Sequence, residues 1–414
     1  MDPLPALEVD AFTTMTLGIV VYFLGARLTA KLPILRAYSI PEPVSGGLLA
    51  AVAALGVVWL TGREVTWTLS IRDALLVYFF TTVGLNARLS DLVKGGPVLA
   101  LMLALTLGYM FLQNLVGLAT AVIAGLPVQA GVLLGTASLV GGHGTAIAWG
   151  PTIARDFGVE GAAELGVAMA TLGLILASVL GGPIAKHLVE RRGAAPEAED
   201  ARVPGASGAP SYAAAYLEER LPSQGPVNGS DLMRAILWIH VAIMVGFPLG
   251  EGLKAAGLSL PAFVPCLIAA IFLSNLMPRV LPRLESPAGA PAVKLTQEFS
   301  LSVFLSMSLM SMELWTLGGH VTALAINMVL QSLAAVVFIL LVVFPLMGRN
   351  YFAAVISGGF AGFTLGATPT AIANMTAVTQ RYGPAPLAFI VLPLVSAFFV
   401  DIANALIMQF FLSL

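Results

Sequence analysis

Long apolar stretches alternate with short polar connections along the whole chain. They are longer and more continuous than the alternating segments of a transmembrane β-barrel, so they predict membrane-spanning helices. The predicted helices are residues 11–30, 48–60, 73–87, 97–124, 162–184, 232–253, 261–276, 299–317, 322–347 and 386–412. They form two groups of five, within residues 1–192 and 232–414. Between them, residues 193–231 are rich in Pro, Gly, Ala and charge, which predicts a solvated linker with one short helix at 212–220.

The composition agrees with a membrane protein. Hydrophobic residues make up 58% of the 414 residues and charged residues only 10%, whereas a soluble domain carries about a quarter charged residues. The single cysteine, Cys266, excludes an intrachain disulfide and a Cys-based metal cluster. The acidic start lacks the basic region of a cleavable signal, so we expect the first helix to be retained.

The positions of the basic residues predict the orientation. If the N-terminus lies outside and each predicted helix crosses once, the outer side keeps four Lys and Arg residues: Arg63, Arg72, Arg155 and Lys254. The remaining sixteen of the 20 lie on the inner side, as the positive-inside rule requires. Both termini are then periplasmic. Since five crossings per half is an odd number, the two halves are predicted to be inverted repeats.

Two Gly-rich stretches, residues 131–149 and 355–375, occupy matching places in the two halves. Residues 145–148 and 370–373 both read TAIA, 225 residues apart. Such backbone is tolerated at membrane depth only where protein covers it or where it lines a cavity. In the predicted topology, the first stretch enters from outside and the second from the cytoplasm. We interpret them as re-entrant loops that meet near the midplane, as in secondary transporters. Packing of helices through small residues is the alternative interpretation.

The tips of these loops are candidate substrate contacts. Helix is expected to resume at Thr145, and Pro369 suits a first helical turn. Free N–H groups at a helix start attract anions, so the two tips could hold two carboxylates, or one from both sides. The candidate substrate-binding residues are Gly141, Gly142, His143, Gly144, Thr145, Thr368, Thr370, Asn374 and Asp401. His143 could donate to an anion or carry a proton, or be a buried histidine satisfied by backbone.

Asp401 is the most informative single residue, because a carboxylate inside a membrane helix is costly unless it is paired. Asn404 lies on the same helix face, three residues later. Their oxygens suit Na⁺ or a substrate ammonium group, or a structural hydrogen bond to a neighbouring helix. The candidate metal ligands are Asp401, Asn404, Ser138 and Asn86. There is no P-loop, H-E-x-x-H or G-x-S-x-G motif, so neither an ATP-driven pump nor an enzyme is expected.

Four motifs resemble the bacterial sodium/glutamate symporter family: IPEPVSGG at 40–47, GGHGTA at 141–146, GATPTAIANM at 366–375 and DIANAL at 401–406. That family is similar in fold to the sodium-coupled citrate carriers, with inverted repeats and two re-entrant loops. For this chain we therefore expect an all-α polytopic membrane protein with two inverted five-helix repeats, each with a re-entrant Gly-rich loop. The resemblance implies a homodimer embedded in the lipid of the bacterial inner membrane. It also implies L-glutamate as substrate, Na⁺ as coupling ion, and an elevator-like movement of a transport domain against a scaffold. Neither an organic cofactor nor a nucleic-acid partner is expected.

Two other readings remain open from the residues. One is a Na⁺- or H⁺-coupled carrier of another di- or tricarboxylate on the same frame. The other is a channel or a sensor with a transporter-like fold, although a sensor would be expected to carry a signalling domain.

Overall fold

The structure, a computed structural model, describes residues 7–37, 40–63, 65–87, 96–191, 227–255, 260–280 and 287–414. The expected linker at 193–231, with its short helix at 212–220, lies outside these residues up to position 226. Helices dominate the described residues, which confirms the all-α class apart from one small sheet. Among these described residues, six helices are long and apolar enough to cross a membrane, or seven if a bent pair near the C-terminus counts as one span.

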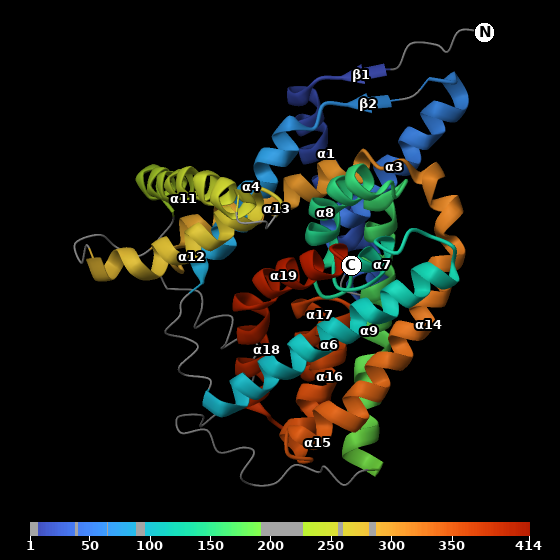
Figure 1. Ribbon diagram of the computed structural model, residues 1–414, viewed down its shortest axis with the longest axis vertical. Helices are drawn as coiled ribbons and strands as arrows, with labels where there is room; N and C mark the ends of the chain where they lie inside the picture. The colour runs from blue at the N-terminus through green and yellow to red at the C-terminus, as the bar shows by residue number, and fades with distance from the viewer. Residues whose placement is uncertain are drawn as a thin grey trace. The chain divides into compact units, whose positions relative to one another are not determined.

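The helices and strands follow the chain in this order (Figure 1). The first half contains β1 (Leu7–Val9), α1 (Ala11–Lys31), α2 (Pro33–Ala37), α3 (Glu42–Thr61), β2 (Val65–Trp67), α4 (Ser70–Asn86), α6 (Gly96–Ile123), α7 (Ala130–Leu134), α8 (Gly142–Phe157) and α9 (Ala162–Arg191). The second half contains α11 (Gly229–Ala255), α12 (Phe263–Val280), α13 (Pro291–Met310), the 3₁₀ helix η1 (Leu314–His320), α14 (Val321–Phe338), the π-helix η2 (Ile339–Val343), α15 (Phe344–Leu346), α16 (Tyr351–Leu365), α17 (Thr368–Tyr382), α18 (Pro386–Phe398) and α19 (Val400–Leu412).

The chain forms two compact units, and each draws on both halves of the sequence. Unit 1 contains residues 1–87, 143–167 and 226–321. Unit 2 contains residues 88–142, 168–225 and 322–414. The first three predicted helices of each half therefore pack in unit 1, and the last two pack in unit 2. The division into repeats at 1–192 and 232–414 describes the sequence and stays a prediction, because packing follows a different partition.

Unit 1 is held together by close helix contacts at glycines. A Cβ on Gly25 of α1 would lie 1.9 Å from the carbonyl oxygen of Glu42, at the start of α3. A Cβ on Gly46 would lie 2.1 Å from the carbonyl oxygen of Val21. Small residues of this kind let membrane helices approach closely. The parallel pairing of β1 with β2 (Figure 1) was not predicted, because three-residue strands are too short to show a period.

Several predicted boundaries are wrong, each for a local reason. Helix α3 begins at Glu42, because Pro43 fits its first turn; the prediction began it after residue 47. Helix α13 spans Pro291–Met310 and not 299–317, since Lys294 and Gln297 made its first turns read as a polar connection. The last predicted helix, 386–412, is two helices, α18 and α19, that meet near Phe399 at an angle of 48°.

Unit 2 contains a helical hairpin built from the second Gly-rich stretch. Helices α16 and α17 are joined by Gly366 and Ala367. A Cβ on Gly362 of α16 would lie 2.7 Å from the Cα atom of Ala371 on α17. One on Gly359 would lie 2.7 Å from the sulfur of Met375. The glycines of this stretch therefore bring the two arms into backbone contact.

Candidate functional site

The first Gly-rich stretch is broken after the short helix α7. Residues 135–141 form turns, and the carbonyl oxygen of Thr136 accepts two of the hydrogen bonds that hold them. It accepts hydrogen bonds from the backbone N–H of Gly141 at 2.8 Å and from Asn404 Nδ2 of α19 at 3.1 Å. The backbone N–H and the hydroxyl of Thr136 both donate to Asn114 Oδ1 of α6, at 3.0 and 3.1 Å. The turn is therefore fixed between α6 and α19.

The helix that follows this turn begins at Gly142, three residues before the predicted start at Thr145. The physical reason is the backbone of Gly142, which has a φ of 68° and so reverses the chain direction at little cost. His143 and Gly144 can then occupy the first turn, where N–H groups have no intrahelical partner in any helix.

A ladder of buried amide side chains connects both Gly-rich stretches within unit 2. The carbonyl oxygen of Leu134, the last residue of α7, accepts from Asn327 Nδ2 at 2.6 Å and from Gln331 Nε2 at 3.3 Å. Gln331 also donates to the carbonyl oxygen of Gln113 at 2.9 Å. Gln113 Nε2 donates in turn to the carbonyl oxygen of Thr364, near the end of α16, at 2.8 Å. Side chains of α14 thus donate to the Leu134 carbonyl oxygen at the break in the first stretch, and α6 donates to the Thr364 carbonyl oxygen near the break in the second.

The hairpin tip offers uncapped donors at the start of α17. Its N-cap residue, Ala367, makes no side-chain cap, and Pro369 occupies the first turn as predicted. The hydroxyl of Thr370 is buried and has no hydrogen-bond partner within the described part of the chain. The hydroxyl of Thr368 forms a hydrogen bond with the hydroxyl of Ser396 on α18, with an oxygen–oxygen distance of 2.5 Å. The dipole and the free N–H groups of such a helix start favour an anionic ligand.

Asn374, one turn further along α17, fixes the hairpin in place. Its Nδ2 donates to the carbonyl oxygens of Ala177 on α9 and Gly358 on α16, at 3.0 and 3.4 Å. It therefore has a packing role here, and its predicted contact with substrate stays a prediction.

Asp401 lies in the first turn of α19, directly after the break in the last predicted helix. Within the described residues, its carboxylate has neither a hydrogen bond nor an ion pair. Asn404, fully buried one turn later, uses Nδ2 on Thr136 and leaves Oδ1 without a partner among these residues. A carboxylate and an amide oxygen on one face, both without donors in apolar surroundings, are costly unless a cation or a protonated group completes them.

The predicted site residues divide between the two units. Those in unit 2 are Ser138, Gly141, Gly142, Thr368, Thr370, Asn374, Asp401 and Asn404, and those in unit 1 are Asn86, His143, Gly144 and Thr145. Ser138 donates its hydroxyl to the carbonyl oxygen of Leu133. Asn86 donates to Gln297 Oε1 at 2.8 Å and accepts from the N–H of Gly289 at 3.1 Å. Both side chains thus have structural partners, and their roles as metal ligands stay predictions.

Asn327 and Gln331 are the residues that the sequence interpretation missed. They lie four residues apart in α14, one of the most apolar helices of the chain. Two amide side chains on one face of such a helix indicate buried hydrogen-bond partners. Their spacing in the sequence could therefore have identified them as polar contacts inside the protein. In the described ranges, no group of three His, Cys, Asp or Glu residues could hold a metal ion. An ion site within these ranges would therefore also need amide, hydroxyl or carbonyl oxygens.

Comparison with known proteins identifies the family. A sequence model of the family described as "Sodium/glutamate symporter" matches residues 7–384. The chain is 37% identical over 414 residues to proteins named sodium/glutamate symporter from Escherichia coli (strain K12) and Shigella flexneri, covering 98% of either chain. It is 34% identical to that of Haemophilus influenzae, covering 97% of this chain and 96% of the relative. The chain therefore belongs to the sodium/glutamate symporter family, and it is a multi-pass membrane transporter and not an enzyme.

Proposed function

We propose that this protein carries L-glutamate together with Na⁺ across the bacterial inner membrane into the cell. The observation that carries the proposal is the face of α19 where Asp401 and Asn404 each present oxygen without a donor among the described residues. Na⁺ is a hard cation that prefers such oxygens. The same Asn404 binds the turn of the first Gly-rich stretch through Thr136. An ion at this face would therefore stabilise the backbone that surrounds the substrate.

The substrate is proposed to bind at the two Gly-rich tips. The start of α17 offers uncapped donors, and the start of α8 has the same polarity. The residues proposed to contact glutamate are Gly141, Gly142, His143, Gly144, Thr145, Thr368, Thr370, Asn374 and Asp401. The ion is proposed to use Asp401 and Asn404, with Ser138 and Asn86 as further candidate ligands.

Movement of unit 2 against unit 1 is the transport mechanism we propose. The amide ladder supports it, because Gln113, Asn327 and Gln331 connect the α7 turn and the α16–α17 hairpin through one set of buried hydrogen bonds. Elements connected in this way can move as one rigid body, as an elevator mechanism requires. The proposal also includes two inverted repeats of five crossings, re-entrant loops, a homodimer and periplasmic termini.

The test is uptake of labelled glutamate into proteoliposomes, with and without Na⁺, for wild type and for Asp401→Asn. Wild-type uptake should disappear when choline replaces Na⁺. The variant keeps the shape of the side chain and removes its charge, so the concentration of Na⁺ needed for half-maximal uptake should rise at least tenfold. Asp156→Asn is the matched control, because Asp156 is exposed and, among the described residues, pairs with the adjacent Arg155 alone.

The outcomes separate the parts of the proposal. Full uptake in choline would remove Na⁺ coupling. An unchanged Na⁺ dependence in Asp401→Asn would remove Asp401 from the ion site and leave the symport itself standing. Competition by malate and citrate at the concentrations at which glutamate competes would favour a carrier of other di- or tricarboxylates.

A further inference from the structure

Unit 1 contains a cavity of about 290 Å³ that the proposed site does not use. It lies where the N-terminal ends of α4 and α9 approach the C-terminal end of α13. The distribution of basic residues predicts all three ends to face the periplasm. The cavity has the size of a small-metabolite pocket, at the lower end of the usual range of about 300 Å³ and above. Ile147 of α8, in the TAIA motif, forms part of its wall.

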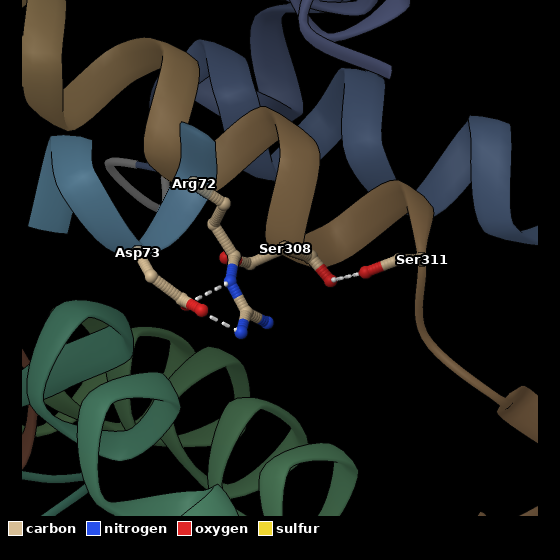
Figure 2. A network of polar contacts seen from close by, with 4 residues as sticks. All are labelled: Arg72, Asp73, Ser308 and Ser311. Carbon is tan, nitrogen blue, oxygen red and sulfur yellow. Dashed lines mark hydrogen bonds and ion pairs between the residues drawn. The ribbon is translucent and has the colours of Figure 1, made fainter. Parts of the chain in front are cut away.

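Arg72 gives the cavity one positively charged wall. Its side chain is only 16% exposed, and Nε and Nη2 both donate to Asp73 Oδ1, at 2.9 and 2.6 Å. Figure 2 shows the Arg72 side chain extending past Ser308, with the Asp73 carboxylate along one edge of the guanidinium. A guanidinium has five N–H donors, so Arg72 retains donors for a second carboxylate.

Three acidic residues also line the cavity and give it a negatively charged wall. Glu160 precedes α9, Glu164 lies in its first turn, and Glu313 follows α13. Glu164 Oε1 accepts from the backbone N–H of Glu313 at 3.2 Å, which holds the Glu164 carboxylate at the wall. These acids do not form a metal cluster, since no three such groups among the described residues could share one ion. Because Arg72 and the three glutamates line the same cavity, the lining suits a ligand that carries charge of both signs.

One residue of the cavity lining has a buried hydroxyl that is left unsatisfied among the described residues. Ser308 is one of the lining residues, and its Oγ is buried without a hydrogen-bond partner within the described chain. Its carbonyl oxygen accepts from Ser311 Oγ at 3.0 Å (Figure 2). Buried hydroxyls normally have a hydrogen-bond partner. The rest of the floor is apolar, with Ile147, Val167 and Met312, and suits the carbon chain of a small zwitterion.

We infer that this cavity is an outer subsite for an α-amino acid, in which Arg72 binds the α-carboxylate and Glu164 the α-ammonium group of glutamate. The inference rests on the proposed function, because it takes glutamate as the substrate that approaches from outside. The acidic wall repels dicarboxylates that lack an ammonium group. The subsite therefore selects amino acids before the substrate reaches the Gly-rich tips, and glutarate, which is glutamate without its ammonium group, is the compound that it should exclude.

The experiment compares Arg72→Gln and Glu164→Gln with wild type in Na⁺-driven uptake, with glutarate as competitor. Loss of a charge-assisted hydrogen bond should raise the KM of Arg72→Gln for glutamate about tenfold while kcat is kept. Glu164→Gln should lower the preference for glutamate over glutarate by a similar factor. The matched control is Arg155→Gln, because Arg155 also pairs with the next residue, Asp156, but is 72% exposed and does not line the cavity.

The result that overturns the subsite is an unchanged KM in Arg72→Gln together with an unchanged glutamate-to-glutarate preference in Glu164→Gln. If Arg72→Gln does not fold, as judged by thermal unfolding, Arg72→Lys and Glu164→Gln decide the question. Wild type that transports without Na⁺ would remove the proposed coupling and not the subsite. Equilibrium binding of labelled glutamate to purified protein, weakened about tenfold by Arg72→Gln, would still support the subsite in that case.

Discussion

The carbonyl oxygen of Leu134 can be tested with a double-mutant cycle, and the structure predicts the sign of the interaction free energy between the two mutations. Its two hydrogen-bond donors are the side chains of Asn327 and Gln331, at 2.6 and 3.3 Å. Asn327→Leu or Gln331→Leu alone leaves the carbonyl with one donor. Hydrogen bonds between membrane helices contribute about 0.6 kcal/mol each and up to about 1.7 kcal/mol. Gln331→Leu loses two hydrogen bonds, and Asn327→Leu loses three, including those with Thr120 and Met169. Each single variant should therefore lower the free energy of unfolding by roughly 1–2 kcal/mol.

The double variant leaves the Leu134 carbonyl with no donor, and an unsatisfied backbone group away from water costs several kcal/mol. Its destabilisation should exceed the sum of the single variants by at least about 1 kcal/mol. The measurement is reversible unfolding in mixed micelles, followed by tryptophan fluorescence. Ser332→Ala is the control on the same helix, because the Ser332 hydroxyl donates to the carbonyl oxygen of Met328 within its own helix and to no other group in the described part of the chain. If the two single effects simply add to within about 0.5 kcal/mol, the shared carbonyl does not connect them and the reasoning fails.

Three further predictions test other parts of the molecule. Gly362→Leu should abolish uptake, because the new Cβ alone would lie 2.7 Å from the Cα atom of Ala371 and separate the hairpin arms. Gly108→Leu is the control and should retain uptake, because no neighbouring atom of the described residues lies within 4 Å of a Cβ built there. Equal uptake by the two variants would contradict the close packing. Asp10 caps α1 and its pKa is lowered, first of all by a hydrogen bond from the Thr13 side chain. Its contribution to stability is therefore present above the ordinary Asp pKa and lost as the pH falls through the lowered value, so the thermal midpoint of wild type should fall more steeply with acid than that of Asp10→Asn. Finally, transport should be electrogenic. An anion that enters against an inside-negative potential costs about 2.3 kcal/mol per 100 mV, and one Na⁺ entering with it only cancels this cost. Accumulation of glutamate beyond the Na⁺ gradient therefore needs at least two Na⁺ ions. Uptake that ignores an imposed potential would contradict this coupling.

Much of the architecture could be predicted, because apolar runs of membrane length leave few alternatives. With no water to bond to, backbone groups in such runs must form helices. The two Gly-rich stretches were recognised for the same reason, since glycines and hydroxyls are unusual in so apolar a chain. Asp401 was recognised because a carboxylate there is expensive. Its position after a helix break was not, since residues 386–412 read as one apolar helix and only packing shows the bend between α18 and α19.

The partners of the polar residues could not be predicted. Asn327 and Gln331 donate to main-chain carbonyls of segments far away in the chain, and Asn114 accepts from a main-chain N–H in the next Gly-rich turn. Spacing along a helix indicates which side chains share a face but not which backbone they meet. The cavity beside Arg72 illustrates the same limit, because its walls come from residues 69–72, 147–167 and 308–313.

The sequence by itself determined the class of protein, the places of the two Gly-rich stretches and the cost of burying Asp401. These properties depend on local composition and on the absence of water in the membrane. Tertiary structure alone decided that the halves divide between two units, that one amide ladder serves both broken stretches, and that Asn404 reaches the turn at Thr136. Such pairings depend on hydrogen bonds between groups more than 200 residues apart, and no local pattern carries that information.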